Sequence, residues 1–525
     1  MRLVTVLLFT AVGTALAQTP NADDLVWRKA VQKFDAQRTA ILEKVDSTGH
    51  AGPFQPTWES LKSYQAPQWY QDAKFGIFIH WGAYSVPSFG SEWYPREMYH
   101  QGSREFKHHV ATYGPQAKFG YKDFIPLFKA EKFDPKAWAD LFRQSGAKYV
   151  MPVGEHHDGF PMYNSDLTDW CAAKMGPHRD VVGELAEAVR SEGLHFGVSS
   201  HRAEHYFFLN LGRAFDSDVR DPRYAAFYGP AHAGVEPLKN GMHWNGHPDA
   251  AYMDDWLART AEIVERYHPD IVWFDWWIET KEFEPYLQRF ASFYYNDAAR
   301  RGATAAINYK FDAYPQGAAV LDIERGQLDR PESRFWQTDT SISIKSWGYI
   351  ENDSFRSPES LIHQLIDIVS KNGCLLLNIG PKPDGTIPEQ EQQILLDMGR
   401  WLGVNGEAIY GTRPWTTYGE GPTKVVGGSF NDTATKAYKS QDIRFTTKGN
   451  VLYAIALGWP ENGALTIKTL AQGAAADLGT IGKVELIGSD AELKWTREAS
   501  GLRIEIPGPK VGEYAWVFRI THGSR

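Results

Sequence analysis

The sequence predicts an α/β fold: a (β/α)₈-like barrel of the TIM type, followed by a C-terminal antiparallel β-sandwich domain. Two observations lead to this prediction. From about residue 70 to 405, short apolar runs alternate with amphipathic stretches, as strands do when helices connect them into a parallel sheet. After about Thr412 the pattern changes to short alternating runs separated by Gly, Pro, Asn and Asp, which is typical of antiparallel strands.

Eight apolar runs are candidate barrel strands, and six amphipathic stretches between them are candidate helices. The strands are expected at residues 75–81, 148–153, 195–199, 270–275, 303–308, 319–323, 335–338 and 373–379. The helices are expected at residues 136–144, 181–191, 253–267, 285–300, 358–370 and 389–402. Because the runs are unevenly spaced, we expect a distorted or incomplete barrel rather than a regular one.

The same patterns divide the chain into four parts. We expect a signal peptide at 1–17, a leader helix and loop at 18–65, the barrel at 66–411 and the β-sandwich at 412–525. Strands of the sandwich are expected at residues 451–457, 465–469, 483–486, 493–498, 502–506 and 514–520. We interpret this second domain as packing support for the barrel.

Residues 1–17 have the parts of a secretory signal peptide. Arg2 supplies the charged start, residues 3–12 are apolar, and Ala15-Leu16-Ala17 fits the cleavage rule. We therefore expect export, with a mature protein that starts near Gln18 and is periplasmic or secreted. The apolar run is shorter than the roughly 20 residues that cross a bilayer, and no later segment is long enough, so we expect no membrane span.

Composition narrows the classes of partner. The formal net charge is -9 and no basic run is present, so nucleic acid is not an expected partner. Aromatic residues make up 14% of the chain, with 19 Trp, and aromatic rings stack on the apolar faces of sugars, which favours a carbohydrate ligand. Cys171 and Cys374 are too few for a cysteine metal site, and an exported protein of this size does not require a disulfide.

Polar side chains gather at the predicted C-terminal ends of the barrel strands, where the loops of such a barrel converge on one cavity. They are His80, His156, His157, His201, Arg202, Asp275 and Glu324. Asp275 ends the apolar run 270–275, and a carboxylate at that position is costly unless it is solvated, paired or used in chemistry. Asp275 is therefore a candidate nucleophile, with a structural ion pair as the alternative.

Two histidine motifs favour binding of a hydroxyl-rich ligand. His80 ends the run 76–82, and His156 with His157 follows another predicted strand, so their imidazoles can hydrogen-bond to hydroxyls. A zinc site is the rival interpretation, because His, Glu155 and Asp158 are all possible zinc ligands. Adjacent histidines on a turning loop do not reproduce the spacing of a helical zinc motif, so we expect no metal and no cofactor.

Several motifs in one order resemble the family 29 α-L-fucosidases. They are WY at 69–70, KFGIFIHWG at 74–82, SEWY at 91–94, GEHHDGF at 154–160, PDIVWFD at 269–275, SWGY at 346–349 and NGCLLLNIGP at 372–381, with Asp384-Gly385 and Pro388. Together they cover residues 65–415. The resemblance implies exo-hydrolysis of terminal α-L-fucose from fucosylated oligosaccharides or glycoconjugates, with retention, through a covalent fucosyl-enzyme intermediate.

The resemblance also implies roles for single residues. Asp275 matches the family nucleophile. Residues that match positions gripping the fucose hydroxyls or its apolar face are His80, Glu92, Trp93, His156, His157 and Trp273. Trp347 matches an aromatic position near the sugar's methyl group, and an indole suits the 6-deoxy methyl that distinguishes fucose from galactose.

The acid/base is expected at Glu324, which ends a predicted strand, with Glu332 as the competitor. Arg325 beside Glu324 would depress the pKa of this carboxyl unless the guanidinium points elsewhere. Lys310 departs from the family pattern, since relatives tend to carry Arg there. Trp276 and Trp277 also depart, because small residues often follow the nucleophile.

Two alternatives to a metal-independent hydrolase remain at this point. A catalytically inactive, lectin-like fucose-binding protein would keep the histidines and tryptophans without turnover. A metal-dependent hydrolase would lose activity with a chelator. The sequence leaves the oligomeric state and the preferred linkage open.

Overall fold

The computed structural model describes residues 22–233, 247–460, 462–475 and 478–523. The expected signal peptide at 1–17 lies outside the described residues. Within them, none of the helices combines the length and the apolar character that crossing a membrane requires. Both cysteines are buried and free.

Eight parallel strands form a closed barrel in chain order, with β8 pairing back to β1. The strands are β1 Phe75–Ile79, β2 Tyr149–Glu155, β3 His195–Ser200, β4 Ile271–Phe274, β5 Ala306–Tyr309, β6 Val320–Glu324, β7 Trp336–Ser341 and β8 Gly373–Ile379. Almost every strand residue is buried, because one face fills the barrel interior and the other lies under the helices. All eight predicted strands are present.

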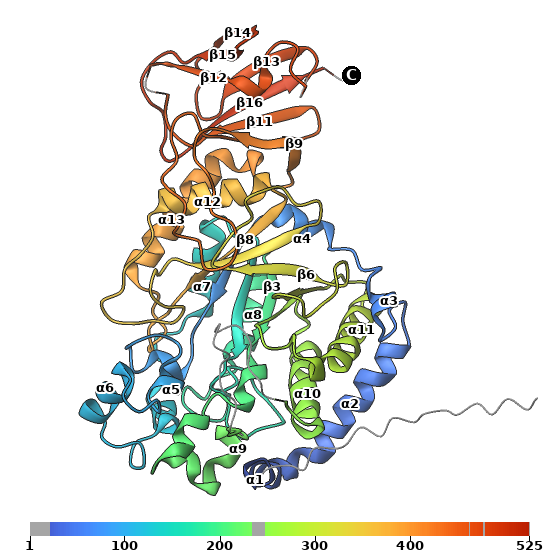
Figure 1. Ribbon diagram of the computed structural model, residues 1–525, viewed down its shortest axis with the longest axis vertical. Coiled ribbons are helices and arrows are strands. Elements are labelled where there is room, and N and C mark those ends of the chain that lie inside the picture. The colour runs from blue at the N-terminus through green and yellow to red at the C-terminus, as the bar shows by residue number, and fades with distance from the viewer. Residues whose placement is uncertain (1–21, 234–246, 461, 476–477, 524–525) are drawn as a thin grey trace, which may run out of the picture.

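Six long helices cover the barrel, and each predicted helix is found (Figure 1). They are α7 Pro135–Gln144, α8 Val181–Ser191, α10 Ala250–Tyr267, α11 Glu284–Arg300, α12 Pro358–Ser370 and α13 Glu389–Asn405. Local sequence fixes their starts: Asp134 caps α7 by accepting from the backbone N–H groups of Lys136 and Ala137, and Pro135 takes the first helical position.

The barrel is closed but irregular. Among the described residues, the β5–β6 and β6–β7 connections contain no helix, which accounts for part of the uneven spacing of the strands. The β1–β2 and β3–β4 connections are long and carry short helices, α5 Tyr94–Glu97, α6 Arg104–Thr112 and α9 Ala225–Tyr228.

The N-terminal part holds more than the single leader helix that the sequence predicts. Its helices are α1 Ala22–Val31, α2 Asp35–His50 and α3 Trp58–Leu61, and α4 Gln68–Ala73 then leads into β1. Helix α2 packs along α10 and α11 (Figure 1). Buried or half-buried ion pairs fix it there, including Arg38 Nη2 with Asp255 Oδ1 at 2.9 Å and Arg289 Nε with Asp46 Oδ1 at 2.8 Å.

Two antiparallel sheets form the C-terminal part. The first has the order β13-β16-β11-β10-β9 and the second the order β12-β15-β14. The strands are β9 Arg413–Glu420, β10 Ile443–Lys448, β11 Val451–Ala456, β12 Ala464–Ile467, β13 Ile481–Leu486, β14 Lys494–Glu498, β15 Gly501–Glu505 and β16 Trp516–His522. All six expected strands are present, and β9 and β10 are additional.

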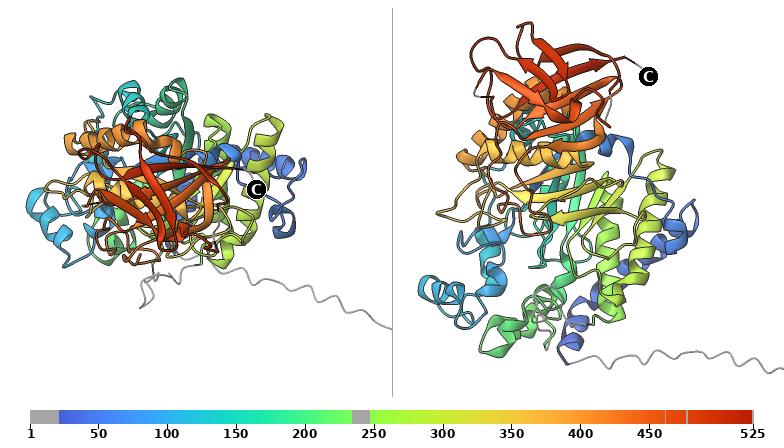
Figure 2. Two further views of the ribbon diagram at one scale, coloured as in Figure 1. Left: turned by 90° about the horizontal axis from the view of Figure 1, so that it is seen from above. Right: turned by 45° about the horizontal axis from the view of Figure 1, so that its top comes forward.

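The five-stranded sheet lies on helices α12 and α13 (Figure 2). Side chains alternate along β11: Tyr453 and Ile455 join the core that contains the barrel helices, whereas Leu452 and Ala454 face the second sheet. A buried ion pair between Arg444 Nε and Asp367 Oδ1, at 2.6 Å, joins β10 to α12. One face of the five-stranded sheet therefore packs into the core of the barrel helices, while its other face forms a separate core with the second sheet.

Candidate active site

A pocket of about 410 Å³ opens at the C-terminal ends of the barrel strands. That volume suits a small ligand such as a monosaccharide. The residues singled out from the sequence for catalysis or binding all line it: Asp275, Glu324, His80, Glu92, Trp93, His156, His157, Trp273 and Trp347. Residues from nearly every strand end meet there because parallel barrel strands all point their carboxyl ends at the same rim.

Asp275 follows β4 directly and is 7% exposed. Three cationic or N–H groups surround its carboxylate. His201 Nδ1 lies 3.0 Å and His157 Nε2 3.3 Å from Oδ2, and Lys310 Nζ lies 3.2 Å from Oδ1. Burial alone would raise the pKa of Asp275, but Lys310, His201 and His157 outweigh it and hold this pKa well below its usual range. Asp275 is therefore ionised in the pocket.

Glu324 ends β6 and lies on the other side of the same ammonium group. Its Oε2 accepts a hydrogen bond from Lys310 Nζ at 2.6 Å. Burial raises the pKa of Glu324, and the neighbouring Asp275 carboxylate adds to the rise, while Lys310 opposes it; the net direction is upward. The two carboxyl groups thus have pKa values displaced in opposite directions.

The Arg325 guanidinium has partners other than Glu324, and its charge lowers the pKa of Glu324 less than Lys310 does. The guanidinium lies over the Trp347 ring at 4.7 Å and donates to the carbonyl oxygens of Ser343 and Ser346. Arg325 has φ +41°, a left-handed backbone conformation that turns the chain sharply after β6. The pKa of Glu324 is therefore raised despite the neighbouring Arg325.

Glu332 lies elsewhere. It is exposed and precedes β7, so it sits near the N-terminal ends of the strands, opposite the pocket, and its backbone N–H donates to Lys371 O. Its Oε1 accepts from Ser333 and from the backbone of Arg334. Of the two acid/base candidates, only Glu324 lines the pocket.

His157 carries protons on both ring nitrogens. Its Nδ1 faces the carbonyl oxygen of His201 at 3.0 Å and its Nε2 faces Asp275, and both partners can only accept. Burial lowers the pKa of His157, but the carboxylates of Glu204 and Asp275 outweigh it and raise this pKa to about 9. An imidazolium at this position supports the ionised state of Asp275.

His80, by contrast, is neutral with a defined tautomer. Its Nδ1 lies 2.7 Å from Asn378 Oδ1, and the amide nitrogen of Asn378 donates to Ser341 Oγ and Trp347 O. The Asn378 oxygen is thus the acceptor, so His80 Nδ1 carries the proton and Nε2 is left to accept one from a ligand hydroxyl. Burial and the nearby His201 hold the pKa of His80 well below its usual range.

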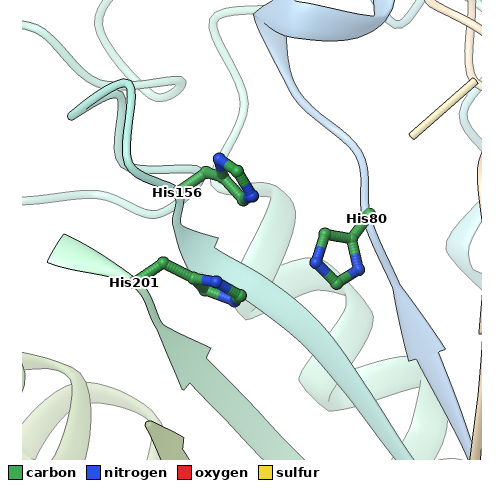
Figure 3. Close-up of side chains that lie close together, drawn as sticks. All are labelled: His80, His156 and His201. Carbon is green, nitrogen blue, oxygen red and sulfur yellow. The ribbon is translucent and has the colours of Figure 1, made fainter. Parts of the chain in front are cut away.

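His80, His156 and His201 form a cluster in which one ring nitrogen of each residue lies within 4.8 Å of the other two (Figure 3). His156 Nδ1 is buried and has no hydrogen-bond partner among the described residues. A buried orphan of this kind fits a hydroxyl that arrives with the ligand. The cluster has the donor atoms for a transition-metal ion, as do His157, His201 and Asp275, so metal chemistry has to be tested by experiment.

Glu92 and Trp347 belong to motifs that are far apart in the sequence, and a hydrogen bond joins them. Glu92 Oε2 accepts from the backbone N–H of Trp347 at 2.8 Å and from Ser346 Oγ at 3.1 Å. This arrangement fixes the SWGY turn at 346–349 over the pocket. The Trp347 ring centroid lies 5.1 Å from that of His80, so the indole forms an apolar wall beside a hydroxyl-binding group.

The two tryptophans after the nucleophile candidate point in different directions. Trp276 lines the pocket, whereas Trp277 is fully buried beneath it and packs on Phe207 and Phe283. Trp277 has φ +77°, a conformation that a bulky residue adopts only when packing enforces it.

The pocket also holds Lys310, His201 and Asp339, to which no role was assigned from the sequence. Lys310 was noted only as a departure from the family pattern, yet it contacts both candidate carboxylates and lies 3.5 Å from Asp339 Oδ2. His201 follows β3 and donates to Asp275. The available signal was position alone: Lys310 directly follows β5, His201 directly follows β3, and Asp339 lies in the second half of β7.

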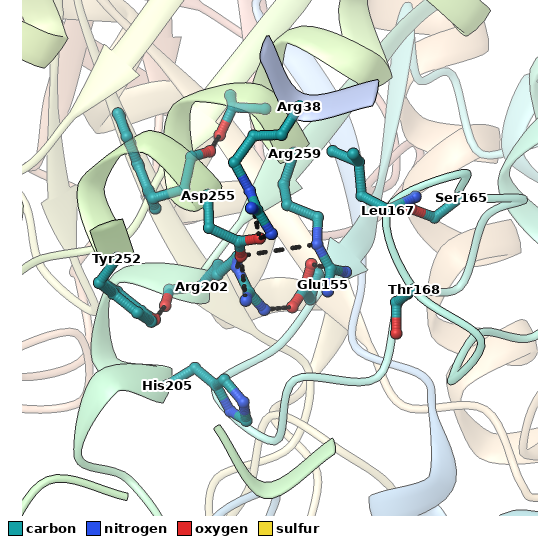
Figure 4. A network of polar contacts seen from close by, with 12 residues as sticks. Arg38, Glu155, Ser165, Leu167, Thr168, Arg202, His205, Tyr252, Asp255 and Arg259 are labelled. Carbon is teal, nitrogen blue, oxygen red and sulfur yellow. Dashed lines mark hydrogen bonds and ion pairs between the residues drawn. The ribbon is translucent and has the colours of Figure 1, made fainter. Parts of the chain in front are cut away.

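A buried ion network supports the histidine loops from behind (Figure 4). Glu155 does not line the pocket; its carboxylate pairs with Arg202 and, at 3.4 Å, with Arg259. Arg202 and Arg38 both pair with Asp255 of α10. Glu155 directly precedes His156, and Arg202 directly follows His201, so the network anchors both loops.

Two family models match the chain. The one described as "Alpha-L-fucosidase" matches residues 41–407, and the one described as "Alpha-L-fucosidase C-terminal domain" matches residues 431–521. Tissue α-L-fucosidase of Homo sapiens is 32% identical over 502 residues, which covers 92% of this chain and 95% of the human protein. α-L-Fucosidase of Branchiostoma floridae is 32% identical over 481 residues, 89% of this chain and 95% of that protein.

Solved structures give the same result. The crystal structure of Thermotoga maritima α-fucosidase in complex with fucose superposes with a TM-score of 0.69 at 32% identity, covering 89% of this chain and 99% of that one. The same bacterial enzyme with a mechanism-based inhibitor superposes with a TM-score of 0.70 at 31% identity, covering 89% of this chain and 100% of that one.

Proposed function

The chain belongs to the α-L-fucosidase family of glycoside hydrolases, and on that premise we propose that it removes terminal α-L-fucose from fucosylated glycans with net retention. Asp275 is the nucleophile and Glu324 the acid/base in this proposal. The competing idea of an inactive fucose-binding protein finds no support, because both carboxyl groups face one pocket.

The shared contact with Lys310 is the observation that carries the retaining mechanism. Lys310 Nζ lies 3.2 Å from Asp275 Oδ1 and 2.6 Å from Glu324 Oε2. The two oxygens are therefore at most about 5.8 Å apart, the sum of those distances, which fits the roughly 5–5.5 Å of retaining enzymes better than the roughly 6.5–9.5 Å of inverting ones.

Both half-reactions use the same pair of groups. Glu324 gives its proton to the glycosidic oxygen as the bond to the anomeric carbon breaks, and an Asp275 oxygen bonds to that carbon. Glu324, now ionised, takes a proton from water, and the water oxygen displaces Asp275 to release fucose. The opposite pKa displacements of the two carboxyls give each the protonation state that its first step needs.

The remaining pocket residues hold the sugar in this proposal. His80 Nε2 and His156 Nδ1 are positioned to meet hydroxyls, and the free oxygen of Glu92 accepts from another. Trp347 faces the 6-deoxy methyl, where an apolar contact favours fucose over its hydroxylated counterpart.

Stereochemistry and chemical rescue test the mechanism together. We expect Asp275→Ala to lower kcat for an aryl α-L-fucoside by several orders of magnitude and azide to restore part of the rate by attacking the open face of the sugar. Proton NMR of the wild-type reaction should show the α-anomer of fucose first. Initial release of the β-anomer would contradict double displacement.

A chelator separates this proposal from a metal-dependent hydrolase. We expect full activity after exhaustive dialysis against EDTA. Loss of activity that zinc restores would instead assign the histidine cluster at His80, His156 and His201 a catalytic metal.

We also propose export through the N-terminal segment, to a periplasmic or extracellular site. The supporting observation is the charged, apolar and small-residue order of residues 1–17. Mass spectrometry of the protein recovered from its producing cells should give a chain that begins near Gln18.

A further inference from the structure

The position of the acid/base fixes where the leaving group lies, and this step rests on the proposed function. Glu324 gives its proton to the oxygen between fucose and the rest of the glycan. The sugar that departs must therefore sit on the Glu324 side of the pocket, beyond the end of β6.

Two exposed apolar side chains form the rim on that side. Ile344, in the loop after β7, is 47% exposed, and Phe430, between β9 and β10, is 55% exposed. Among the described residues, eight large apolar side chains are exposed, and only these two line the pocket, whose other walls combine polar side chains with tryptophans. Large apolar groups left open beside a polar site indicate a surface that a ligand covers.

Phe430 is held in place next to Glu324 by the backbone. Its N–H donates to Glu324 O at 2.9 Å, and the N–H of Asp432 donates to Arg325 O at 2.8 Å. Phe430 has φ +60°, an unfavourable conformation for a bulky residue that these bonds maintain. The C-terminal part of the chain thus supplies one wall of a pocket otherwise built by the barrel.

A glycine permits this close approach. A Cβ at Gly326 would lie 2.1 Å from the carbonyl oxygen of Gly428, so a larger residue would push the segment away. The N–H of Gly428 also donates to Gln327 O at 2.8 Å.

A second cavity, of about 400 Å³, continues from this rim and shares Ile344, Asp432 and Thr433 with the pocket. Its lining is mostly polar. Gln327, which is 3% exposed, lines it, and Oε1 of this side chain has no hydrogen-bond partner among the described residues. A buried orphan acceptor beside an open cavity fits a ligand hydroxyl.

We propose that Phe430 and Ile344 form the platform for the leaving-group sugar and that the adjoining cavity binds the next sugar of the glycan. A pyranose presents an apolar C–H face that packs on an aromatic ring, while its hydroxyls point to the polar sides. The enzyme then discriminates between glycans through a segment outside the barrel.

Two substrates with different leaving groups test the platform. α-L-Fucosyl fluoride releases an ion that cannot reach the platform, whereas a fucosylated trisaccharide releases a disaccharide that must cross it. We expect Phe430→Ala and Ile344→Ala to lower the trisaccharide-to-fluoride ratio of kcat/KM about tenfold, the loss of one good apolar contact. Phe430→Trp, which keeps a ring, should retain the ratio within about threefold.

Val426→Ala is the matched control, because Val426 is an exposed apolar residue of the same segment that does not line the pocket. It should leave both rates unchanged. Ratios in Phe430→Ala and Ile344→Ala within twofold of wild type would overturn the platform. Both side chains are exposed, so their truncation removes little core packing, and circular dichroism with thermal melting verifies the fold of each variant.

A length series tests the adjoining cavity. Wild-type kcat/KM should rise from a fucosylated disaccharide to the trisaccharide, and equal values would show that the second cavity binds nothing. If the wild-type enzyme does not hydrolyse α-L-fucosyl fluoride, the proposed function is contradicted. If it does, but the trisaccharide-to-fluoride ratios of kcat/KM are unchanged in Phe430→Ala and Ile344→Ala, only the leaving-group site is contradicted.

Discussion

At the scale of single residues, Lys310 determines the charge balance of the pocket. Lys310 is 2% exposed, and its ammonium group lies against Asp275, Glu324 and Asp339. Burial lowers the pKa of Lys310, but these carboxylates outweigh it and raise the pKa well above its usual range. One permanent positive charge thus acts on the nucleophile and on the acid/base at once.

Replacing Lys310 should therefore move the whole pH profile. Removing a cation raises the pKa of a nearby carboxyl, so in Lys310→Met both Asp275 and Glu324 titrate at higher pH. We expect both limbs of the kcat/KM profile to move to higher pH and the maximum to fall, with Lys310→Arg close to wild type. A profile that changes only in height would contradict this role.

The acid/base assignment predicts a dependence on the leaving group. Glu324→Ala should slow substrates with poor leaving groups, such as alkyl or sugar aglycones, far more than activated aryl fucosides, because only the former need a proton. Glu332→Ala is the matched control and should behave as wild type with both. The reverse pattern in the two variants would reassign the role.

The sequence could identify pocket residues where a strand end coincided with a family motif. His80, His156, His157 and Asp275 are of this kind. It could not show that Lys310 links the carboxyls, because β4, β5 and β6 have to be paired before the contact exists. Nor could it place Phe430, since nothing local signals that a segment between two sandwich strands returns to the barrel rim.

At the scale of elements, the buried ion network joins α2, β2 and α10 behind the histidine loops (Figure 4). Its members are the carboxylates Glu155 and Asp255 and the guanidiniums Arg38, Arg202 and Arg259. Burial raises the pKa of Asp255, but Arg202, Arg259 and Arg38 outweigh it and hold the pKa far below its usual range. Because three guanidiniums share two carboxylates, we expect the loss of one carboxylate to destabilise the network more than the loss of one guanidinium.

Two substitutions test whether the balance of charges in the ion network determines how much each residue contributes to stability. Asp255→Asn leaves three cations with one carboxylate and should cost about 3–5 kcal/mol of stability, whereas Arg38→Met leaves two of each and should cost about 1 kcal/mol. Thermal denaturation at neutral pH measures both. Equal losses would show that charge balance does not control the network. We also expect Asp255→Asn to raise KM, because the loops carrying His156 and His201 lose their anchor.

Element prediction succeeded where the hydrophobic period was long and clear. The helices α8, α11 and α12 were located to within one residue at either end, because caps and prolines mark their starts. Strands β9 and β10 were missed. β9 contains a proline and a glycine and is only half buried, and β10 follows a polar stretch, so neither stands out as an apolar run.

At the scale of the whole molecule, the apolar contact between the five-stranded sheet and the barrel helices should couple the unfolding of the two domains. Tyr453 and Ile455 of β11 pack in the same core as Leu361 and Trp401 of the barrel helices. We expect a single calorimetric transition and an insoluble product from a chain that ends at residue 411, because the faces of α12 and α13 would then be bare. Two separated transitions would contradict this prediction.

The β5–β6 and β6–β7 connections, which contain no helix among the described residues, have a consequence for how the site can change in evolution. Because β5, β6 and β7 follow one another without an intervening helix, Lys310, Glu324 and Asp339 fall within 30 consecutive residues of the chain. The nucleophile and the hydroxyl-binding histidines are encoded well upstream. Exchange of one short stretch of the gene can therefore replace Lys310, Glu324 and Asp339 together, while the residues assigned to fucose binding lie outside that stretch on both sides.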